Sequence, residues 1–342
     1  MNKLWINNTL EDRLAMLQQT EEALSGINQS AIEKDWWVTV VLHALFQCTC
    51  APALIFKGGT SLSKGFNLIE RFSEDIDLAI HRSFFGIDKT SKSQREKLRK
   101  LSRSFIQEDL STQLDKQLQR MGITGYQIEN VTSQQSQGGE LLPIDSDKDP
   151  TVIFLHYRSI VADTIDYIPS RVKIEISCLS MDEPTQECRI RSMISERFPE
   201  EDTVTSFIRT VLPTRTFLEK IFLLAEEFQK EHPRYVRMSR HLYDLERIMD
   251  TEYGKEALTN RELYDAIVEH RRTFYALKYV DYDKHIPGVI SFIPRDELIS
   301  DWKKDYDSMQ AHFLYGSTLS FDELLKRIAD LQGRVRKIAN IS

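Results

Sequence analysis

The sequence predicts an α+β protein in which a core with a small mixed sheet precedes a helical C-terminal domain. Two observations lead to this prediction. Short apolar runs typical of strands occur between residues 54 and 177, whereas patterns with helical period follow one another after residue 199. We therefore expect two domains, residues 1–198 with N-terminal helices and residues 199–342.

The expected elements follow in chain order. Helices over 10–24 and 32–48 precede strands near 54–56 and 75–80, and a long helix over about 91–121 leads into a polar loop, 132–150, and strands near 153–160 and 171–177. In the C-terminal half, Thr216-x-x-Glu219 and Ser320-x-x-Glu323 have the spacing of capping boxes. The first box predicts a helix over 217–230, and the second predicts a helix after Ser320 whose apolar stripe includes Leu324.

Composition indicates an ordinary globular protein. Of the 342 residues, 41% are hydrophobic and 28% are charged. No apolar run approaches the roughly 20 residues that a membrane span requires, and the first residues do not resemble a secretory signal. Four cysteines without metal-ligand spacing argue against a disulfide scaffold and against zinc. We expect a cytoplasmic protein with reduced cysteines and no membrane association.

The most informative stretch begins at residue 57, where an apolar run enters a double glycine that opens a helix. Paired glycines let backbone N–H groups approach a phosphate closely, and the start of a helix presents positive charge to that anion. Asp75 and Asp77 then open a second apolar run, and side chains two residues apart in a strand point to the same face. Neighbouring carboxylates favour a cation between them, and Mg²⁺ is held by one or two carboxylates plus substrate phosphates. The two motifs together predict chemistry on a nucleotide.

A third carboxylate is expected on a neighbouring strand. Apolar and polar residues alternate over 171–177, and Glu175 is the only carboxylate on the polar side. We interpret Glu175 as the third metal ligand. The alternative is a solvent-facing glutamate paired with Lys173, in which case Asp163 or Asp166 is the next candidate.

These motifs carry a family resemblance. The glycine pair, the Asp-x-Asp strand and the distal acidic strand resemble the DNA polymerase beta superfamily of nucleotidyltransferases. The whole set resembles the AbiEii/AbiGii toxin family over most of the chain from about residue 30. The segments that carry the closer resemblance are residues 32–37, 57–62, 71–77, 215–220, 240–245 and 302–306. The resemblance implies a polymerase-beta-like core and a nucleotidyltransferase toxin of a toxin–antitoxin or phage-defence pair.

The resemblance also implies roles for individual residues. Asp75 and Asp77 would hold two Mg²⁺ ions, with Mn²⁺ as the alternative metal, and Glu175 would complete the site. Lys220 matches the lysine on the triphosphate side, and Asp244 is the acid carried over from a motif in which His241 replaces the aspartate of many relatives. The expected catalytic residues are Asp75, Asp77, Glu175, Lys220 and Asp244, and the expected nucleotide-binding residues are Lys57, Gly58, Gly59, Thr60, Ser61, Arg71, Ser73, Lys220 and Arg240.

Simpler interpretations exist for several of these residues. Arg240 and Asp244 are four residues apart, the spacing of an ion pair on a helix worth only about 0.3–0.5 kcal/mol. Lys220 has the alternative of a surface lysine reached by Glu219 or Glu227. Trp36 and its neighbour Trp37 are interpreted as core residues rather than a platform for stacking bases.

A basic segment predicts the acceptor. Although the net charge is −7, residues 89–105 contain seven basic residues and one acidic residue. Arg95, Arg99 and Arg103 mark the region that we expect to guide an RNA acceptor, whereas the alternative is the solvated face of a helix with Leu101 turned inward. The related MenT-type toxins extend the 3′ ends of tRNA, so tRNA is the leading acceptor by resemblance.

The expected function is therefore transfer of a nucleoside monophosphate from a nucleoside triphosphate to an RNA 3′ end by a metal-dependent toxin with a cognate antitoxin. Two alternatives remain open. The chain could modify a protein or a small molecule, or it could be a catalytically silent protein that binds a nucleotide or a partner.

Overall fold

The computed structural model describes residues 3–24, 26–87, 91–135, 139–146, 148–161, 169–181 and 183–338. The chain divides into two compact units. The first consists of Met1–Gly65 and Phe72–Thr210, and the second consists of Phe66–Arg71 and Val211–Ser342. Asp163 and Asp166, the reserve candidates for a third carboxylate, lie outside the described residues.

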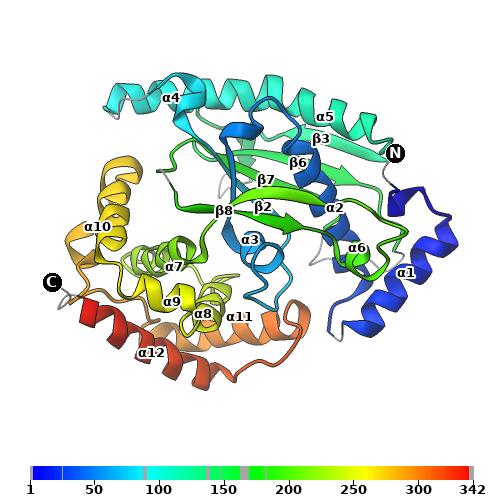
Figure 1. Ribbon diagram of the computed structural model, residues 1–342. Coiled ribbons are helices and arrows are strands. Elements are labelled where there is room, and N and C mark those ends of the chain that lie inside the picture. Colours follow the sequence, from blue (N-terminus) through cyan, green and yellow to red (C-terminus); the bar gives the residue numbers. More distant parts are fainter. Residues whose placement is uncertain are drawn as a thin grey trace. The chain divides into compact units, whose positions relative to one another are not determined.

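The first unit is an α/β unit built on one large sheet (Figure 1). Its elements are η1 Trp5–Asn7, α1 Leu10–Ala23, α2 Gln29–Leu45, η2 Ala51–Ala53, β1 Leu54–Lys57, α3 Gly58–Lys64, β2 Asp75–Ile80, η3 Arg82–Phe85, α4 Lys92–Ser104, η4 Phe105–Leu110, α5 Ser111–Arg120, β3 Tyr126–Asn130, β4 Ser133–Gln135, β5 Leu141–Pro143, β6 Thr151–Tyr157, β7 Arg171–Ser177, β8 Thr185–Ile190, α6 Met193–Arg197 and β9 Ser206–Val211.

The sheet is mixed. Among the described residues it has seven strands in the order β3-β6-β7-β2-β1-β9-β8. Strand β2 pairs parallel with β7 and antiparallel with β1, while β1 pairs parallel with β9. Ile76, Leu78 and Ile80 of β2 are fully buried, as are Ile174 and Ile176 of β7. Alternate residues of the two central strands therefore form the core, and the residues between them occupy the other face of the sheet.

Most expected elements of this unit are confirmed. Strands β2 and β7 have the expected bounds, and the long helix appears as α4 and α5 joined by the π-helical turn η4, one continuous cyan rod in Figure 1. Helix α2 starts at Gln29, three residues earlier than expected, because the side chain of Asn28 caps it by accepting a hydrogen bond from Ala31 N.

Some strands were not expected. The polar loop 132–150 contains the two-stranded hairpin of β4 and β5, and the unit extends beyond the expected boundary at 198 to include β9. In β9, Ile208 faces the core whereas Phe207 is exposed. An apolar residue on the outer face obscures the alternation by which such a strand is recognised.

The second unit is helical. Its elements are α7 Pro213–Glu227, α8 Ser239–Ile248, α9 Glu252–Ala257, α10 Arg261–His270, η5 Arg271–Tyr275, η6 Tyr282–His285, η7 Asp296–Leu298, α11 Ile299–His312 and α12 Phe321–Lys337. The capping box at Ser320 is confirmed, with both reciprocal hydrogen bonds to Glu323 present, and Leu324 is buried as expected.

The expected start of the first helix in this unit is wrong. Helix α7 begins at Pro213 rather than at residue 217, so Thr216 is a buried interior residue and not a cap. Proline is favoured in the first turn of a helix because its fixed φ suits the helix and its missing N–H is not needed there. Glu219 forms ion pairs with Arg215 and Arg271 instead of closing a capping box.

Two expectations from composition can be compared with the structure. All four cysteines are buried and free of disulfides. None of the helices in the described ranges is long and apolar enough to cross a membrane.

Candidate active site

A row of charged residues crosses the central strands of the first unit. In the strand register, Asp77 of β2 lies beside Glu175 of β7 on one side and beside Lys57 of β1 on the other. Asp75 lies two residues before Asp77 and beside Lys173. Adjacent residues in paired strands share a face, so all five lie on the face opposite the buried isoleucines and leucine. The structure thus brings together the three carboxylates expected from the sequence on one face of the sheet.

The start of α3 lies directly against this row. Gly58 has φ +80°, a conformation that favours glycine. A Cβ atom at this position would be 2.7 Å from Asp77 Cγ and would overlap its Oδ2. The expected phosphate-binding turn and the expected metal carboxylate are therefore in direct van der Waals contact, which only a residue without a side chain allows.

The hydroxyl groups of this turn hold the turn itself. Thr60 and Ser61 are fully buried. The Thr60 hydroxyl donates to the carbonyl of Asp75 (2.5 Å) and lies 2.9 Å from Ser73 Oγ, whereas Ser61 Oγ donates to the carbonyl of Gly58 (2.8 Å). These side chains fix α3 against the first residues of β2. Their expected contacts with a nucleotide remain predictions, for which the backbone N–H groups of the turn are the available donors.

The acid on β7 has a partner of its own. Lys173 Nζ lies 2.9 Å from Glu175 Oε1, and both side chains are partly exposed, so the alternative interpretation of Glu175 describes its present contact. No group of three His, Cys, Asp or Glu side chains in the described ranges is arranged to hold a metal ion. The oxygen donors nevertheless suit Mg²⁺ in kind, since Asp75, Asp77 and Glu175 share one face and adjacent register. Metal binding by this row remains a prediction.

Two buried charges on helix α2 hold the elements that carry this row of charged residues. Lys34 Nζ donates to Glu74 (2.6 Å), the residue immediately before Asp75. Asp35 accepts from Lys64 at the end of α3 (2.5 Å). A buried ion pair of this kind costs about 3–5 kcal/mol to break, because the remaining charge is left uncompensated. The motif at residues 32–37 therefore contributes to the site indirectly, because it holds the glycine turn and the acidic strand against one helix.

The same helix supplies core aromatic residues, as expected. Trp36 and Trp37 are almost completely buried, and Trp36 Nε1 donates to Asp202 (2.6 Å). Burial raises the pKa of Asp202, against the hydrogen bonds that it accepts from Val204 N and Trp36. These tryptophans are core residues and are not available for stacking against a base.

The second unit contains a compact cluster of three charged side chains. Asp244 on α8 is fully buried. Arg71 binds it in a bidentate manner, with Nε 2.7 Å from Oδ1 and Nη2 2.8 Å from Oδ2, and Lys220 Nζ on α7 lies 2.8 Å from Oδ2. One carboxylate thus serves two cations. The bidentate fork is the strongest geometry available to an arginine and a carboxylate.

The protonation states of the cluster follow from the presence of two cations beside one carboxylate. Burial acts to raise the pKa of Asp244, but Arg71 and Lys220 outweigh it and hold the pKa below its usual range. Burial lowers the pKa of Lys220, Asp244 opposes this shift, and the charge of Arg71 adds to it. Burial and the charges of Lys220 and Arg240 place the pKa of His241 well below its usual value, so this imidazole is neutral at pH 7.

These contacts bear on several sequence interpretations. Asp244 is fully buried between its two cations, and its expected catalytic role remains a prediction. Arg71 is buried against the same carboxylate, and its expected role as a phosphate ligand remains a prediction as well. Lys220 is not a surface lysine paired with Glu219 or Glu227, because it is buried and bound to Asp244. The partly exposed Arg240 keeps its expected nucleotide role as a prediction.

The basic segment is partly confirmed as a charged surface. Lys97 and Lys100 of α4 are exposed, and so is Leu101, which the alternative interpretation of this segment turned inward. Arg103, one of the three expected RNA contacts, is instead buried, and its Nη2 lies 3.4 Å from the carbonyl of Val131. The sequence alone could not separate Arg103 from Lys100, because the helix face that packs on the sheet depends on partners distant in the chain.

Comparisons with known proteins find a matching family and a similar solved structure. A model of the family described as nucleotidyl transferase AbiEii toxin, type IV toxin–antitoxin system, matches residues 40–327. Among solved structures, the chain is similar to MenT4, a nucleotidyltransferase toxin from Mycobacterium tuberculosis, with 14% identity over 98% of this chain and 89% of that chain and a TM-score of 0.47. At this level of likeness no residue role is taken from that protein. A search of curated proteins finds no match.

Proposed function

Because the chain belongs to the AbiEii family of nucleotidyl transferase toxins of type IV toxin–antitoxin systems, we propose that it transfers a nucleoside monophosphate from a nucleoside triphosphate to the 3′ end of an RNA in a Mg²⁺-dependent reaction. Membership of this family makes the chain a nucleotidyl transfer enzyme that acts as a toxin and has a cognate antitoxin. The metal, the RNA acceptor and the preference for tRNA are the proposed parts.

The contact between Gly58 and Asp77 carries the proposal. It places the start of a helix, with its donors for a phosphate, directly beside a carboxylate that shares a face with Asp75 and Glu175. A phosphate bound at the turn would have its oxygens next to the carboxylates. Only a cation between them makes that arrangement of negative charges favourable.

The residues of the first unit then have distinct tasks. Two Mg²⁺ ions bound by Asp75, Asp77 and Glu175 would polarise the α-phosphate and lower the pKa of the attacking 3′ hydroxyl. The N–H groups at Gly58 and Gly59 bind the triphosphate, and Lys57, beside Asp77 in the register, adds positive charge. The hydroxyl oxygen forms a bond to the α-phosphorus, the bond to the bridging oxygen breaks, and pyrophosphate leaves.

The second unit supplies cations of its own. Arg71 and Lys220 share one buried carboxylate, and Arg240 is close enough to both Lys220 and His241 to shift their pKa values. This excess of positive charge favours a polyphosphate. We retain Lys220 and Arg240 as proposed nucleotide ligands, with Asp244 as the carboxylate that positions Lys220.

The test is an assay that identifies the acceptor directly. Wild-type protein and the Asp77→Asn variant are incubated with Mg²⁺, each of the four α-labelled triphosphates in turn, and total RNA together with a protein extract. We expect label in RNA, strongest in tRNA, with wild type and not with the variant. Label in protein, or label that does not depend on Asp77, would contradict the proposal.

A further inference from the structure

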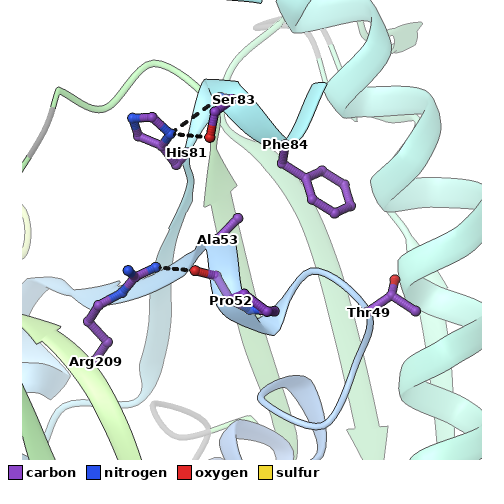
Figure 2. Close-up of a pocket in the computed structure, with 7 residues that line it drawn as sticks. All are labelled: Thr49, Pro52, Ala53, His81, Ser83, Phe84 and Arg209. Carbon is purple, nitrogen blue, oxygen red and sulfur yellow. Dashed lines mark hydrogen bonds between the residues drawn. The ribbon is translucent and has the colours of Figure 1, made fainter. Parts of the chain in front are cut away.

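A cavity opens at the end of strand β2 that is opposite Asp75. The chain leaves β2 after Ile80 and turns through His81 into η3. Beside this turn lies a cavity of about 390 Å³, within the range of about 300–1,000 Å³ typical of small-molecule sites. Its lining residues are Thr49, Pro52, Ala53, His81, Ser83, Phe84 and Arg209, all of the first unit (Figure 2).

One side of this cavity is cationic and polar. In Figure 2, Arg209 and His81 lie on the same side of the cavity. Arg209 Nη2 donates to the carbonyls of Pro52 (2.6 Å) and Leu54 (3.2 Å), which fixes the position of the guanidinium. Its Nε and Nη1 have no hydrogen-bond partner within the described part of the chain, and the side chain is exposed. A guanidinium held in this way presents further N–H donors in the fork that suits a phosphate.

The histidine is held as well. Ser83 N donates to His81 Nδ1 (3.3 Å), and Ser83 Oγ lies 2.6 Å from the same nitrogen. Because Nδ1 accepts a backbone N–H, a neutral His81 ring carries its proton on Nε2. This side of the cavity is therefore built from a fixed guanidinium and a fixed imidazole rather than from long flexible lysines.

The other side of the cavity offers an aromatic ring. Phe84 is 37% exposed, and its ring packs against Phe85 and Phe105 with centroid distances of 5.2 and 4.9 Å. Phe105 follows directly after α4, so the ring is anchored to the end of the basic helix. Leu101 and Lys97, four and eight residues before Phe105, are both exposed and lie on the same side of the helix. The Phe84 ring thus connects the lining of the cavity to the first residue after α4.

We propose that this cavity binds a nucleotide of the RNA acceptor upstream of its reacting 3′ end, with its base stacked on Phe84 and its phosphate bound by Arg209. The inference rests on the proposed RNA acceptor. A fixed aromatic ring together with a fixed cation is the combination that binds single-stranded nucleic acid with little preference for sequence. A protein partner is less favoured by these observations, since the donors on the cationic side suit phosphate and the exposed apolar area is confined to one ring and Leu101.

The strand gives the spacing between the two sites. His81 follows Asp77 by four residues and Asp75 by six, which is about 13–20 Å at ~3.3 Å per residue. Only an acceptor longer than this span reaches both the carboxylates and the cavity.

The experiment measures binding separately from chemistry. Fluorescence anisotropy is recorded without triphosphate, using fluorescein-labelled oligouridylates of about 12 nucleotides, within the size of single-strand binding sites, and of about 3 nucleotides, which can occupy the cavity alone. The proteins are wild type, Phe84→Leu, which keeps an apolar contact to Phe105, Phe84→Tyr, which keeps the stacking ring, and the matched control Tyr279→Leu, which removes an exposed aromatic ring from the second unit. Thermal unfolding confirms that each variant is folded.

We expect Phe84→Leu to bind the longer oligonucleotide about 5- to 150-fold more weakly than wild type, the range found for loss of one stacked base. Phe84→Tyr and Tyr279→Leu should bind it like wild type, and the shorter one should lose affinity in Phe84→Leu alone, because it can occupy the cavity by itself. Equal binding of the longer oligonucleotide by wild type and Phe84→Leu would overturn the inference. A Phe84→Leu variant that the antitoxin no longer neutralises in cells, although its RNA binding is unchanged, would also overturn the inference. The cavity would then be a binding site for a protein.

Transfer of label separates this inference from the proposed function. If wild-type protein labels RNA and Phe84→Leu labels the longer oligonucleotide equally well, only the cavity assignment is wrong. If wild-type protein labels a protein instead of RNA, the proposed acceptor is wrong, and the cavity assignment is wrong with it.

Discussion

Gly58 and Asp77 are in contact in such a way that a Cβ atom at residue 58 would lie 2.7 Å from Asp77 Cγ and overlap Oδ2. Gly58 also has φ +80°. The turn that enters α3 and the acid on β2 can therefore come together only because residue 58 has no side chain. The same contact defines how the candidate active site should respond to substitution.

Gly58→Ala should abolish nucleotidyl transfer, because the added methyl group displaces the Asp77 carboxylate. Adopting the left-handed conformation costs an alanine about 1–2 kcal/mol, so some loss of stability is expected as well. Gly122→Ala is the matched control, since Gly122 has φ +76° and nothing within 4 Å of its added Cβ. Both variants should show similar backbone strain in thermal unfolding, and only Gly58→Ala should lose activity. Equal activity of the two variants would show that the contact with Asp77 is unimportant.

Asp75→Asn and Asp77→Asn should each reduce transfer by about 10²-fold or more, the effect of removing one preorganised group at the reacting centre. Stability should hardly fall, because each change removes a carboxylate that repels its neighbour in the absence of metal. Single-turnover assays and thermal unfolding in EDTA measure the two effects. An early-unfolding variant, or one with normal activity, would contradict the assignment of the metal site.

Glu175→Gln distinguishes a metal ligand from a partner of Lys173. Glutamine keeps the shape of the side chain but not the charge that Mg²⁺ requires, so we expect triphosphate binding to persist while chemistry is lost. Lys173→Gln breaks the same ion pair (2.9 Å) from the other side and should leave the reaction intact. Equal loss of activity in both variants would mean that the ion pair itself, rather than a metal, accounts for the role of Glu175.

Asp244→Asn should destabilise the second unit by about 3–5 kcal/mol, because it leaves two buried cations without their counter-charge. The pKa of Asp244 is held below its unfolded value of about 3.9, so its contribution to stability is complete above roughly pH 5 and is lost as pH falls through the folded-state pKa. Urea unfolding between pH 7 and pH 3 should therefore show the difference between wild type and variant shrinking towards acid pH.

A surface ion pair of the same unit provides the control for this measurement. Asp265 pairs with Arg261 at 2.7 Å, four residues apart on α10, and is exposed. Asp265→Asn should change stability by no more than about 0.5 kcal/mol. A change in Asp244→Asn no larger than this would mean that the buried cluster does not organise the second unit.

Lys97→Gln combined with Lys100→Gln should weaken binding of single-stranded RNA and reduce the log–log salt slope by about 1.4, at ~0.7 per phosphate contact. Both side chains are exposed, so stability should change by less than about 0.5 kcal/mol. Arg103→Gln should instead lower stability, because Arg103 is buried near the carbonyl of Val131.

Titrations of RNA binding at several salt concentrations measure the effect of the two lysine changes. Lys303→Gln plus Lys304→Gln is the matched pair on α11. An unchanged slope in the first pair and a reduced slope in the second would move the RNA to the helical unit.

The sequence by itself determined the acidic strand and its neighbour. The period of two in residues 75–80 and 171–177 places Asp75, Asp77 and Glu175 on polar faces, and both strands have the expected bounds. The capping box at Ser320 was likewise predictable, because its partner is three residues away. Features that depend on period or on short spacing can be read from the chain without knowledge of the fold.

Only the tertiary structure decided which charged residues are buried and with what partners. Lys34 and Glu74 are 40 positions apart, and Arg71 and Asp244 are 173 apart, so no local pattern identifies either pair. The same holds for Gly58 and Asp77, which meet because antiparallel strands β1 and β2 place Lys57 beside Asp77. The burial of Asp244 and Arg71 could not be predicted from the sequence, because ionised side chains are seldom buried unless they are paired, and the pairing that makes burial favourable exists only once the chain is folded.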